Sequence, residues 1–350
     1  MKYKKFIALL LVVCLLLNLC GCKPQEEEVP EEPVDPNFPI TLEIENDSVT
    51  IHEAPTSIVS LSPAITVLFD ELGLDDLLDG VSSYAPAEVA AKKDCGTAQN
   101  VQLETVKEIS PDLLFTDTPL LTEQLTQLQQ MGMEVLLLPR PESAEEIVER
   151  AELILLAVYG KEEGGAKAIE FRKAWEEQWK PLEDAGIAVV EEEKKSVLLL
   201  ADLDLVATGD SWEGQLLKLM GMNNLSDEGK DWQLPQAQTD EAGTVTYLYD
   251  DVVVEWNPDV IFYNSQLDVE TIKASELYSN SSAVGNVALY PVDWGTLQLQ
   301  NGELPEMLGS MVEQVYPDVW ELIQDAIEEA KAAEEAAAQE EAENEEEKEE

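Results

Sequence analysis

The stretch LETVKEISPDLLF, residues 103–115, decides the fold, because residues 249–262, YDDVVVEWNPDVIF, repeat its pattern. In both stretches two acidic residues stand four apart, and a Pro-Asp pair then opens an apolar run. The first acid, Glu104 or Asp251, lies seven residues before the proline in each case. Such self-similarity indicates one supersecondary unit that occurs twice in the chain.

The upstream sequence strengthens the repeat. VLFDELG ends at Gly73 and QLLKLMG ends at Gly221, and the first acid follows these glycines after 31 and 30 residues. Glycine just past an amphipathic stretch is typical of a helix end. The sequence therefore predicts two copies of one α/β unit, and a chance likeness between ordinary helix–strand segments is the alternative.

Each copy reads as apolar strands that alternate with helices. We expect strands at 57–60, 80–81, 113–115 and 135–138 in the first copy, and at 197–201, 260–263 and 287–289 in the second. Helices are expected at 62–73, 103–109, 121–131, 212–220 and 251–256. Alternation of this kind predicts parallel sheets covered on both faces, with functional loops at the carboxyl ends of the strands.

A helical region separates the two copies. Residues 144–159 and 166–179 are helical by pattern, and GKEEGG at 160–165 breaks them. The second helix is the one covalent crossing between the lobes that the sequence indicates. Phe171, Trp175 and Trp179 recur along it at helical spacing, and we expect them to pack against both lobes rather than to hold a ligand.

The N-terminus carries a secretion signal. Lys2, Lys4 and Lys5 precede an apolar stretch at 6–17, which is too short to span a membrane comfortably. LCGC at 19–22 then resembles a bacterial lipobox, which predicts cleavage before Cys22 and lipid on that cysteine. An ordinary signal peptide with incidental cysteines is the alternative. Cys95 would then be the lone thiol of the body, more typical of a small buried residue than of a nucleophile.

These features divide the chain into six parts. They are a lipoprotein signal peptide (1–21), an acidic Pro-rich tether (22–37), an N-terminal lobe (38–160), a linking helix (161–185), a C-terminal lobe (186–327) and an acidic Glu/Ala-rich tail (328–350). We expect the tail to extend the preceding helix for a few turns and then to be disordered, because its glutamates repel one another.

Composition excludes several functions. The 21 basic and 73 acidic residues give a net charge of −52, which excludes a general nucleic-acid binder. The single histidine, His52, argues against a metal site and against His-based catalysis. No nucleophile-elbow, Walker, HExxH, CxxC or dinucleotide-cradle motif is present, and isolated acid pairs carry little information among 73 acids. We therefore expect no enzymatic activity and no cofactor.

Three stretches carry a resemblance to a known family. IVSLSPAITVLFDELGLDDLLDGVSSY (58–84), LETVKEISPDLLF and QLQQMGMEVLLLP (127–139) resemble the substrate-binding lipoproteins of ABC importers for cobalamin, haem and iron siderophores. The likeness covers about residues 38–320, and SLSPAIT and GVSSY are closest to the cobalamin binders. It implies a class III substrate-binding protein, with two Rossmann-like α/β lobes whose parallel sheets are joined by a single long helix.

The resemblance also implies partners. The protein would be a bacterial monomer, held by its lipid on the outer face of the cytoplasmic membrane, and it would deliver a small molecule to an ABC permease dimer with its ATPase. Family members dock through one acid on each lobe, and Glu104 and Asp251 match these positions. The alternative is that both are carboxylates favoured by a helix N-terminus.

The ligand would lie between the lobes. Its expected walls are Tyr84, Thr97, Gln99, Asp117, Thr118, Thr208, Trp212, Trp232, Tyr263, Asp293 and Trp294. Aromatic faces suit a planar macrocycle, although Ala98 and Asp117 stand where cobalamin binders have tryptophans. Few arginines are present, and Arg140 is the one expected near the cleft. We expect a corrinoid first, haem or a neutral or cationic iron chelate second, and a strongly anionic siderophore last. A surface sensor without transport is a further alternative.

Overall fold

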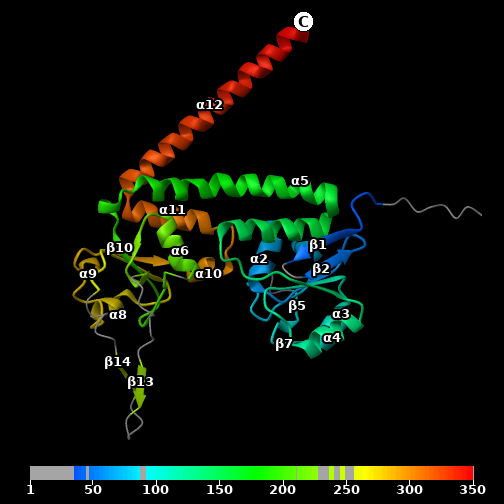
Figure 1. Cartoon of the computed structure of the whole chain (residues 1–350), viewed down its shortest axis with the longest axis horizontal. Helices are drawn as coiled ribbons and strands as arrows, with labels where there is room; N and C mark the ends of the chain where they lie inside the picture. The colour runs from blue at the N-terminus through cyan, green and yellow to red at the C-terminus, as the bar shows by residue number, and fades with distance from the viewer. Residues whose placement is uncertain are drawn as a thin grey trace, which may run out of the picture. The chain divides into compact units, whose positions relative to one another are not determined.

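The computed structural model describes residues 35–44, 47–86, 92–209, 211–227, 236–239, 245–248 and 256–349. Three residues predicted to be functional, Cys22, Trp232 and Asp251, lie outside these ranges, as does nearly all of the predicted helix at 251–256. Figure 1 shows two α/β lobes beneath the long helix α5.

The first lobe is built on a parallel sheet. Its strands follow the order β5-β4-β3-β8-β9, with bounds Lys93–Asp94, Leu78–Val81, Ile58–Ser60, Leu113–Thr116 and Glu134–Leu137. Ile58 and Phe115 enter one buried cluster, while Val59 and Leu114 enter another. Because successive side chains of a strand point to opposite faces, the sheet is buried on both sides, as the apolar runs predict.

The second lobe repeats this plan. Its sheet has the order β11-β10-β15-β16, with bounds Leu205–Val206, Ser196–Asp202, Val260–Asn264 and Leu289–Val292, and β12 (Asn223–Asn224) also pairs with β10. All pairs are parallel except β10 with β11, an antiparallel strand that the sequence did not reveal. The strand expected at 287–289 begins only at Leu289, because Val287 is left-handed with φ of 59°.

Two aspartates show that the repeat is structural. Asp112 precedes β8 and its carboxylate accepts hydrogen bonds from the backbone N–H groups of Thr56 at 2.7 Å and Ser57 at 3.1 Å, just before β3. Asp259 precedes β15 and accepts from the N–H of Ser196 at 3.0 Å, at the start of β10. Each aspartate thus fastens the beginning of one central strand to the next, at the same place in both lobes.

The helices that follow β3 and β10 have the same ends. Ser62 caps α2 (Pro63–Glu71) and Ser211 caps α6 (Trp212–Leu219), each through its hydroxyl oxygen. Gly73 and Gly221 adopt φ of 68° and 73° past the helix ends. The next residue then donates to the carbonyl five positions earlier, at 2.8 Å in the first lobe and 2.9 Å in the second. This is the Schellman ending that glycine permits.

The link between the lobes is α5, Ala144–Ala188, which turns sharply at Gly160. The predicted break across 160–165 is therefore wrong in extent: one residue with φ of 76° reverses the chain, and helix resumes at once. The side chain of Asn37 caps the second segment, accepting from the N–H groups of Glu162 and Glu163 at 3.0 and 3.2 Å. This segment also continues past the predicted end at Trp179.

The stacked aromatics of α5 belong to the core, as expected. Trp175 and Trp179 enter the main buried cluster of the second lobe, whereas Phe171 contacts that cluster and the one in the first lobe. Arg172 binds Glu145 and Glu152 of the first segment, each at 2.7 Å. The two segments of α5 therefore run side by side in opposite directions (Figure 1).

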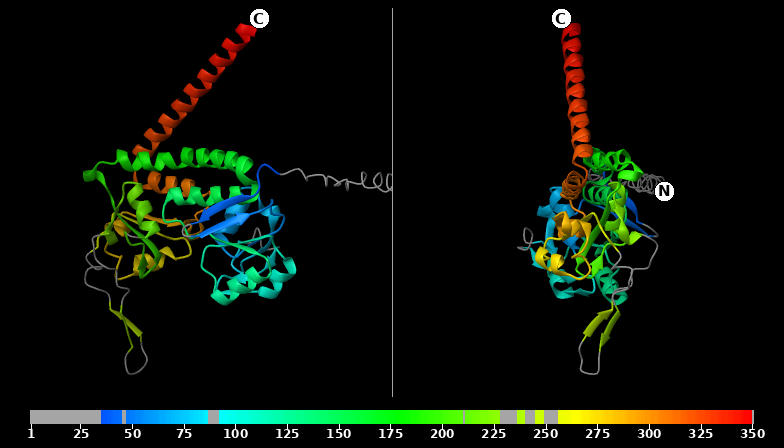
Figure 2. Two further views of the ribbon diagram at one scale, coloured as in Figure 1. Left: turned by 45° about the vertical axis from the view of Figure 1, so that its right-hand side comes forward. Right: turned by 90° about the vertical axis from the view of Figure 1, so that its left-hand side faces the viewer.

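The remaining α-helices and hairpins complete the described chain. They are α3 (Leu103–Ile109), α4 (Thr122–Gln130), α8 (Val269–Ala274), α9 (Ser282–Gly285), α10 (Trp294–Leu299), α11 (Leu304–Val315) and the hairpins β1–β2 (Ile40–Ile44, Asp47–Ile51), β6–β7 (Gly96–Thr97, Asn100–Val101) and β13–β14 (Gln236–Thr239, Val245–Leu248). The final helix α12, Pro317–Glu349, runs through the tail (Figure 2). The predicted disorder of the tail is not seen, because Ala, Glu and Lys strongly favour helix.

Candidate ligand-binding site

The carboxyl ends of the two sheets meet at a polar junction. Arg140 follows β9 of the first lobe, and its Nη2 lies 3.4 Å from the Oε1 of Glu213 in the first turn of α6. Gln298 of α10 accepts from Arg140 at 3.2 Å and donates to Glu213 at 2.6 Å. A pocket of about 320 Å³ opens here, with Arg140 and Glu142 on one side and Ser211 and Trp212 on the other. The lining of this inter-lobe pocket is therefore largely charged and polar, not purely aromatic.

Two further hydrogen bonds tie the lobes together. Gln300 donates to the carbonyl of Pro141 at 2.8 Å, and the N–H of Gly302 donates to Glu71 at 2.5 Å. Burial raises the pKa of Glu71, the Gly302 bond opposes that rise, and the charges of Asp70 and Glu303 add to it. The carboxylate is thus held against the other lobe in a site that weakly resists its ionisation.

Asp117 occupies the end of β8, where the sequence predicts a ligand contact. The hydroxyl of Ser62 donates to its carboxylate, and Thr118 donates to its other oxygen at 3.1 Å. Arg150, which is 5% exposed, is close enough to interact electrostatically with Asp117. Burial lowers the pKa of Arg150 to about 10, although the negative charge of Asp117 opposes this shift. Asp117 is therefore a carboxylate held in place by hydrogen bonds just after the carboxyl end of β8.

Sequence reasoning missed Ser62, Arg150 and Glu213. Ser62 reads as a helix cap, which it is, and its second bond to Asp117 joins residues 55 apart in the chain. Arg150 lies within an ordinary helical pattern, and its Nη2 donates to the carbonyl of Pro139 at 3.2 Å. The scarcity of arginine in this acidic chain is a signal that could have drawn attention to Arg150. Arginine is almost never fully buried unless it is paired.

The other predicted residues of the first lobe lie on turns. Tyr84 follows β4 and is 77% exposed, so its ring is free to meet a ligand. Thr97 and Gln99 belong to the β6–β7 hairpin, where the hydroxyl of Thr97 accepts from the N–H of Asn100 at 3.2 Å. Thr97 thus has a structural partner, and Gln99 is exposed.

The predicted residues of the second lobe mostly have structural partners. Trp212 is 9% exposed within one core cluster, and Tyr263 is buried in another. The carboxylate of Asp293 caps α10, accepting from the N–H of Gly295 at 2.7 Å, and Trp294 is half-buried against the core. Thr208 accepts from the hydroxyl of Ser211 at 2.8 Å through its carbonyl. Of these, Trp212 also reaches the inter-lobe pocket, and its Nε1 has no acceptor among the described residues.

Of the two predicted docking acids, the structure describes one. Glu104 is exposed in the first turn of α3, so both the docking and the helix-terminus readings suit it. Asp251 lies outside the described residues, although β8 and β15, the strands that follow the two repeated segments, occupy matching places in their sheets. Within the described ranges no three His, Cys, Asp or Glu side chains gather as metal ligands, and no helix there is long and apolar enough to cross a bilayer.

The two lobes share one plan, and each has a largely parallel sheet. A single long helix joins them, and they meet at the carboxyl ends of their strands. These features define a class III substrate-binding protein. The chain belongs to the family described as periplasmic binding protein, whose profile matches residues 58–293.

Two relatives agree with this assignment. YvrC of Bacillus subtilis, an uncharacterized ABC transporter substrate-binding lipoprotein, is 27% identical over 325 residues, which are 90% of this chain and 97% of YvrC. A cobalamin-binding protein of Halobacterium salinarum is 23% identical over 260 residues, 73% of this chain and 66% of the relative.

Solved structures share the fold. The haem-binding protein HutB of Vibrio cholerae has a TM-score of 0.59 at 17% identity, covering 75% of this chain and 99% of HutB. The vitamin B12-binding protein BtuF of the same organism has a TM-score of 0.53 at 19% identity, covering 77% of this chain and 98% of BtuF.

Proposed function

We propose that this protein is an extracytoplasmic lipoprotein that binds a corrinoid or an iron chelate and delivers it to the permease dimer of an ABC importer with its ATPase. The observation that carries the proposal is a pair of matched lobes. The carboxyl ends of their strands face one pocket, which residues of both lobes line. Ligands of open α/β sheets bind beyond the carboxyl ends of the strands, which is where this pocket lies.

A corrinoid is the first choice of ligand. A relative named for cobalamin binding supports it, as does the exposed ring of Tyr84 at the end of β4. The junction offers one partly exposed cation, Arg140, beside Glu213 and Glu142, so a polyanion would meet more repulsion than attraction. Haem or a neutral or cationic iron chelate is the alternative within the same fold, and a ligand-sensing lipoprotein without transport is the alternative outside it.

Glu104 and Asp251 are the proposed permease contacts, and Cys22 is the proposed lipid anchor of the monomer. A rigid body that presents one carboxylate from each lobe would be oriented over a two-fold partner at little cost while both remain solvated. The equivalent fastening of β8 and β15 by Asp112 and Asp259 supports equal placement of the two acids.

The ligand test is a titration with cobalamin, cobinamide, haem and several ferric siderophores, followed by intrinsic fluorescence and by thermal stability. All seven tryptophans lie at or after residue 175, so the fluorescence reports on the link and the second lobe. We expect one ligand per chain, with tighter binding of corrinoids, and a rise in melting temperature on saturation.

Tyr84→Ala should weaken corrinoid binding about tenfold without loss of stability, because the ring is exposed. Ile187→Ala, on another exposed apolar side chain, is the matched control. Binding of none of these ligands would refute the proposal and favour a sensor, and turnover of any of them would favour an enzyme.

The docking test is charge reversal. Glu104→Lys and Asp251→Lys together should abolish uptake by the cognate importer while ligand affinity in solution stays unchanged. Glu108→Lys, a further exposed acid of α3, is the control and should leave uptake near its normal level. Normal uptake by the double variant would show that these acids do not dock.

A further inference from the structure

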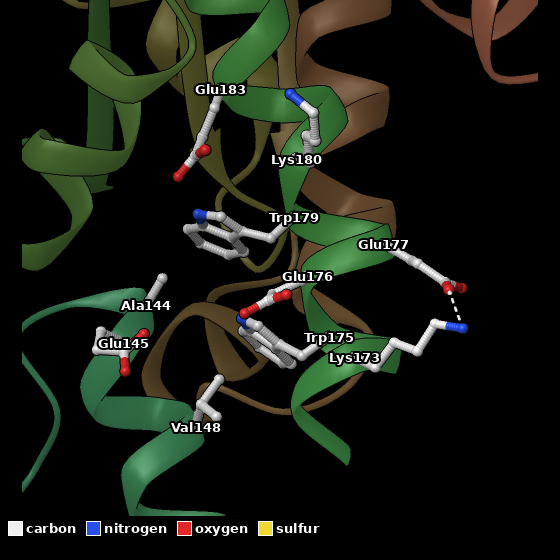
Figure 3. A pocket seen from close by; sticks show the side chains of 10 residues that line it. All are labelled: Ala144, Glu145, Val148, Lys173, Trp175, Glu176, Glu177, Trp179, Lys180 and Glu183. Atoms are coloured by element: carbon white, nitrogen blue, oxygen red, sulfur yellow. Dashed lines mark ion pairs between the residues drawn. The ribbon is translucent and has the colours of Figure 1, made fainter. Parts of the chain in front are cut away.

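A second pocket lies between the two segments of α5. Its volume is about 620 Å³, and Ala144 and Val148 of the first segment form one wall. Trp175, Trp179 and Glu183 of the second segment form another (Figure 3). It shares no lining residue with the inter-lobe pocket, so a ligand bound here would be independent of the proposed transport function.

An aromatic stack runs along this pocket. The rings of Phe171 and Trp175 are 6.2 Å apart and those of Trp175 and Trp179 are 5.6 Å apart, nearly parallel in both pairs. The residues are spaced four apart, so each ring lies one turn beyond the last. The next position in this series is Glu183, which replaces an aromatic with a carboxylate.

Two carboxylates at the pocket form no ion pair with another described residue. Among the described residues Glu145 is paired with Arg172, and Glu177 with Lys173 at 3.8 Å. Glu176 and Glu183 make no hydrogen bond or ion pair within the same ranges, and Figure 3 shows both beside the two indole rings. Lys180 also lines the pocket; it pairs with Asp184 at 2.8 Å and interacts electrostatically with Glu183. Glutamates outnumber lysines in the lining, so the pocket keeps an excess of negative charge.

A buried donor is the independent sign of a ligand. Trp175 is only 6% exposed, and its Nε1 has no acceptor in the part of the chain that the structure describes. A buried donor without an acceptor costs free energy. Carboxylates beside aromatic faces suit a cation, whereas the indole N–H suits an acceptor, and one molecule can supply both.

The same helix already makes this kind of contact. The Nζ of Lys167 lies 4.5 Å from the centre of the Tyr159 ring, across the turn at Gly160. We propose that the pocket between the α5 segments binds a small organic ammonium ion that carries a hydroxyl or ether oxygen. The ammonium group lies over the face of the Trp179 indole, beside the carboxylates of Glu176 and Glu183, and the oxygen accepts a hydrogen bond from the Nε1–H of Trp175.

Choline is the probe, because it combines a quaternary ammonium with a hydroxyl. Titration of the full chain at low salt, followed by calorimetry and tryptophan fluorescence, should show saturable binding of one choline per chain. The neutral isostere 3,3-dimethylbutan-1-ol and the carboxylate-bearing glycine betaine should both bind at least about tenfold more weakly. Added salt should weaken the binding of choline.

Glu176→Gln with Glu183→Gln should weaken choline binding about tenfold, because the two changes remove charge and keep shape. Glu170→Gln, an exposed acid of the same segment outside the pocket, should leave it unchanged. Melting temperatures equal to that of the unchanged protein would show that both variants fold. No saturation below about 10 mM choline, equal binding of the neutral isostere, or unchanged binding by the double variant would each overturn the proposal.

Discussion

The two lobes share their backbone framework and differ at the carboxyl ends of their strands. In both, an aspartate fastens neighbouring strands, a serine caps the next helix and a glycine ends that helix. At the carboxyl edge of the first lobe, polar groups such as Asp117 hold one another and Tyr84 stands in solvent. At the edge of the second lobe, Trp212 and Tyr263 fill cores and Asp293 caps a helix.

The two lobes keep the same backbone hydrogen bonds and differ in the side chains at the carboxyl ends of their strands. Backbone fastenings lie at strand starts and helix ends, where geometry must be kept for the lobe to fold. The other side chains at the carboxyl ends of the strands differ between the two copies, and several of them in the second lobe pack in the core or cap a helix. The two lobes therefore offer a ligand different surfaces: polar or exposed side chains in the first lobe, and largely core-packed ones in the second, of which Trp212 also lines the inter-lobe pocket.

The strongest test removes one equivalent ring from each lobe. Phe115→Ala and Phe262→Ala should each lower the free energy of unfolding by about 3–5 kcal/mol, because both rings are fully buried. Urea unfolding should be followed by labelling of Cys95 for the first lobe and by tryptophan fluorescence for the second. Each variant should shift mainly its own probe. Equal shifts of both probes would show that the lobes unfold as one unit.

Cys95 gives a pH test of the first lobe alone. Burial raises the pKa of its thiol to about 11, so at pH 8 the folded protein should be alkylated about 100-fold more slowly than a free thiol. The unfolded thiol ionises first as pH rises, so stability should fall between about pH 9 and 11. The measurement is labelling in a variant with Cys14, Cys20 and Cys22 changed to serine. Rapid labelling of the native protein would contradict the buried site.

The equivalent glycines should differ in their tolerance of a side chain. Gly73→Ala meets no atom within 4 Å, so its cost is the left-handed backbone alone, about 1 kcal/mol. Gly221→Ala would add a methyl 3.1 Å from Gly186 and 3.2 Å from Val189, and should cost about 2 kcal/mol or more. Urea midpoints of the two variants provide the comparison. An equal loss of stability in the two variants would mean that the last turn of α5, around Gly186, shifts without cost to admit the methyl group.

The smallest effect is expected at the junction of the lobes. Arg140→Ala should cost about 1 kcal/mol or less, because the Arg140 side chain is 46% exposed and water screens its pair with Glu213. A double-mutant cycle with Glu213→Gln in low and high salt would measure the coupling. Lys107→Ala, at an exposed position of α3, is the control. A coupling that salt leaves unchanged would show a more buried pair than the structure describes.

Local patterns predicted the frame well. The apolar run after Pro111 and the one after Pro258 became the matched strands β8 and β15, and Gly73 and Gly221 ended their helices as expected. Two-residue strands such as β11 were not predicted, because so short a segment carries no hydrophobic periodicity. The turn at Gly160 was placed, but its length was not, because one residue with positive φ suffices when Asn37 caps the second segment of α5.

The site was predicted less well, for a physical reason. Position along the chain shows which residues follow a strand, but not whether each side chain turns into the cleft or into the core. Trp212 and Tyr263 follow the correct elements and are largely buried in cores. The contact of Ser62 with Asp117 and that of Arg140 with Glu213 join distant segments, so no local pattern contains them.

Asn37 has a mechanical consequence. Its carbonyl and side chain grip the first N–H groups of the long α5 segment, at Lys161, Glu162 and Glu163. A pull on the chain before Asn37 would therefore act on the start of the long α5 segment as well as on β1.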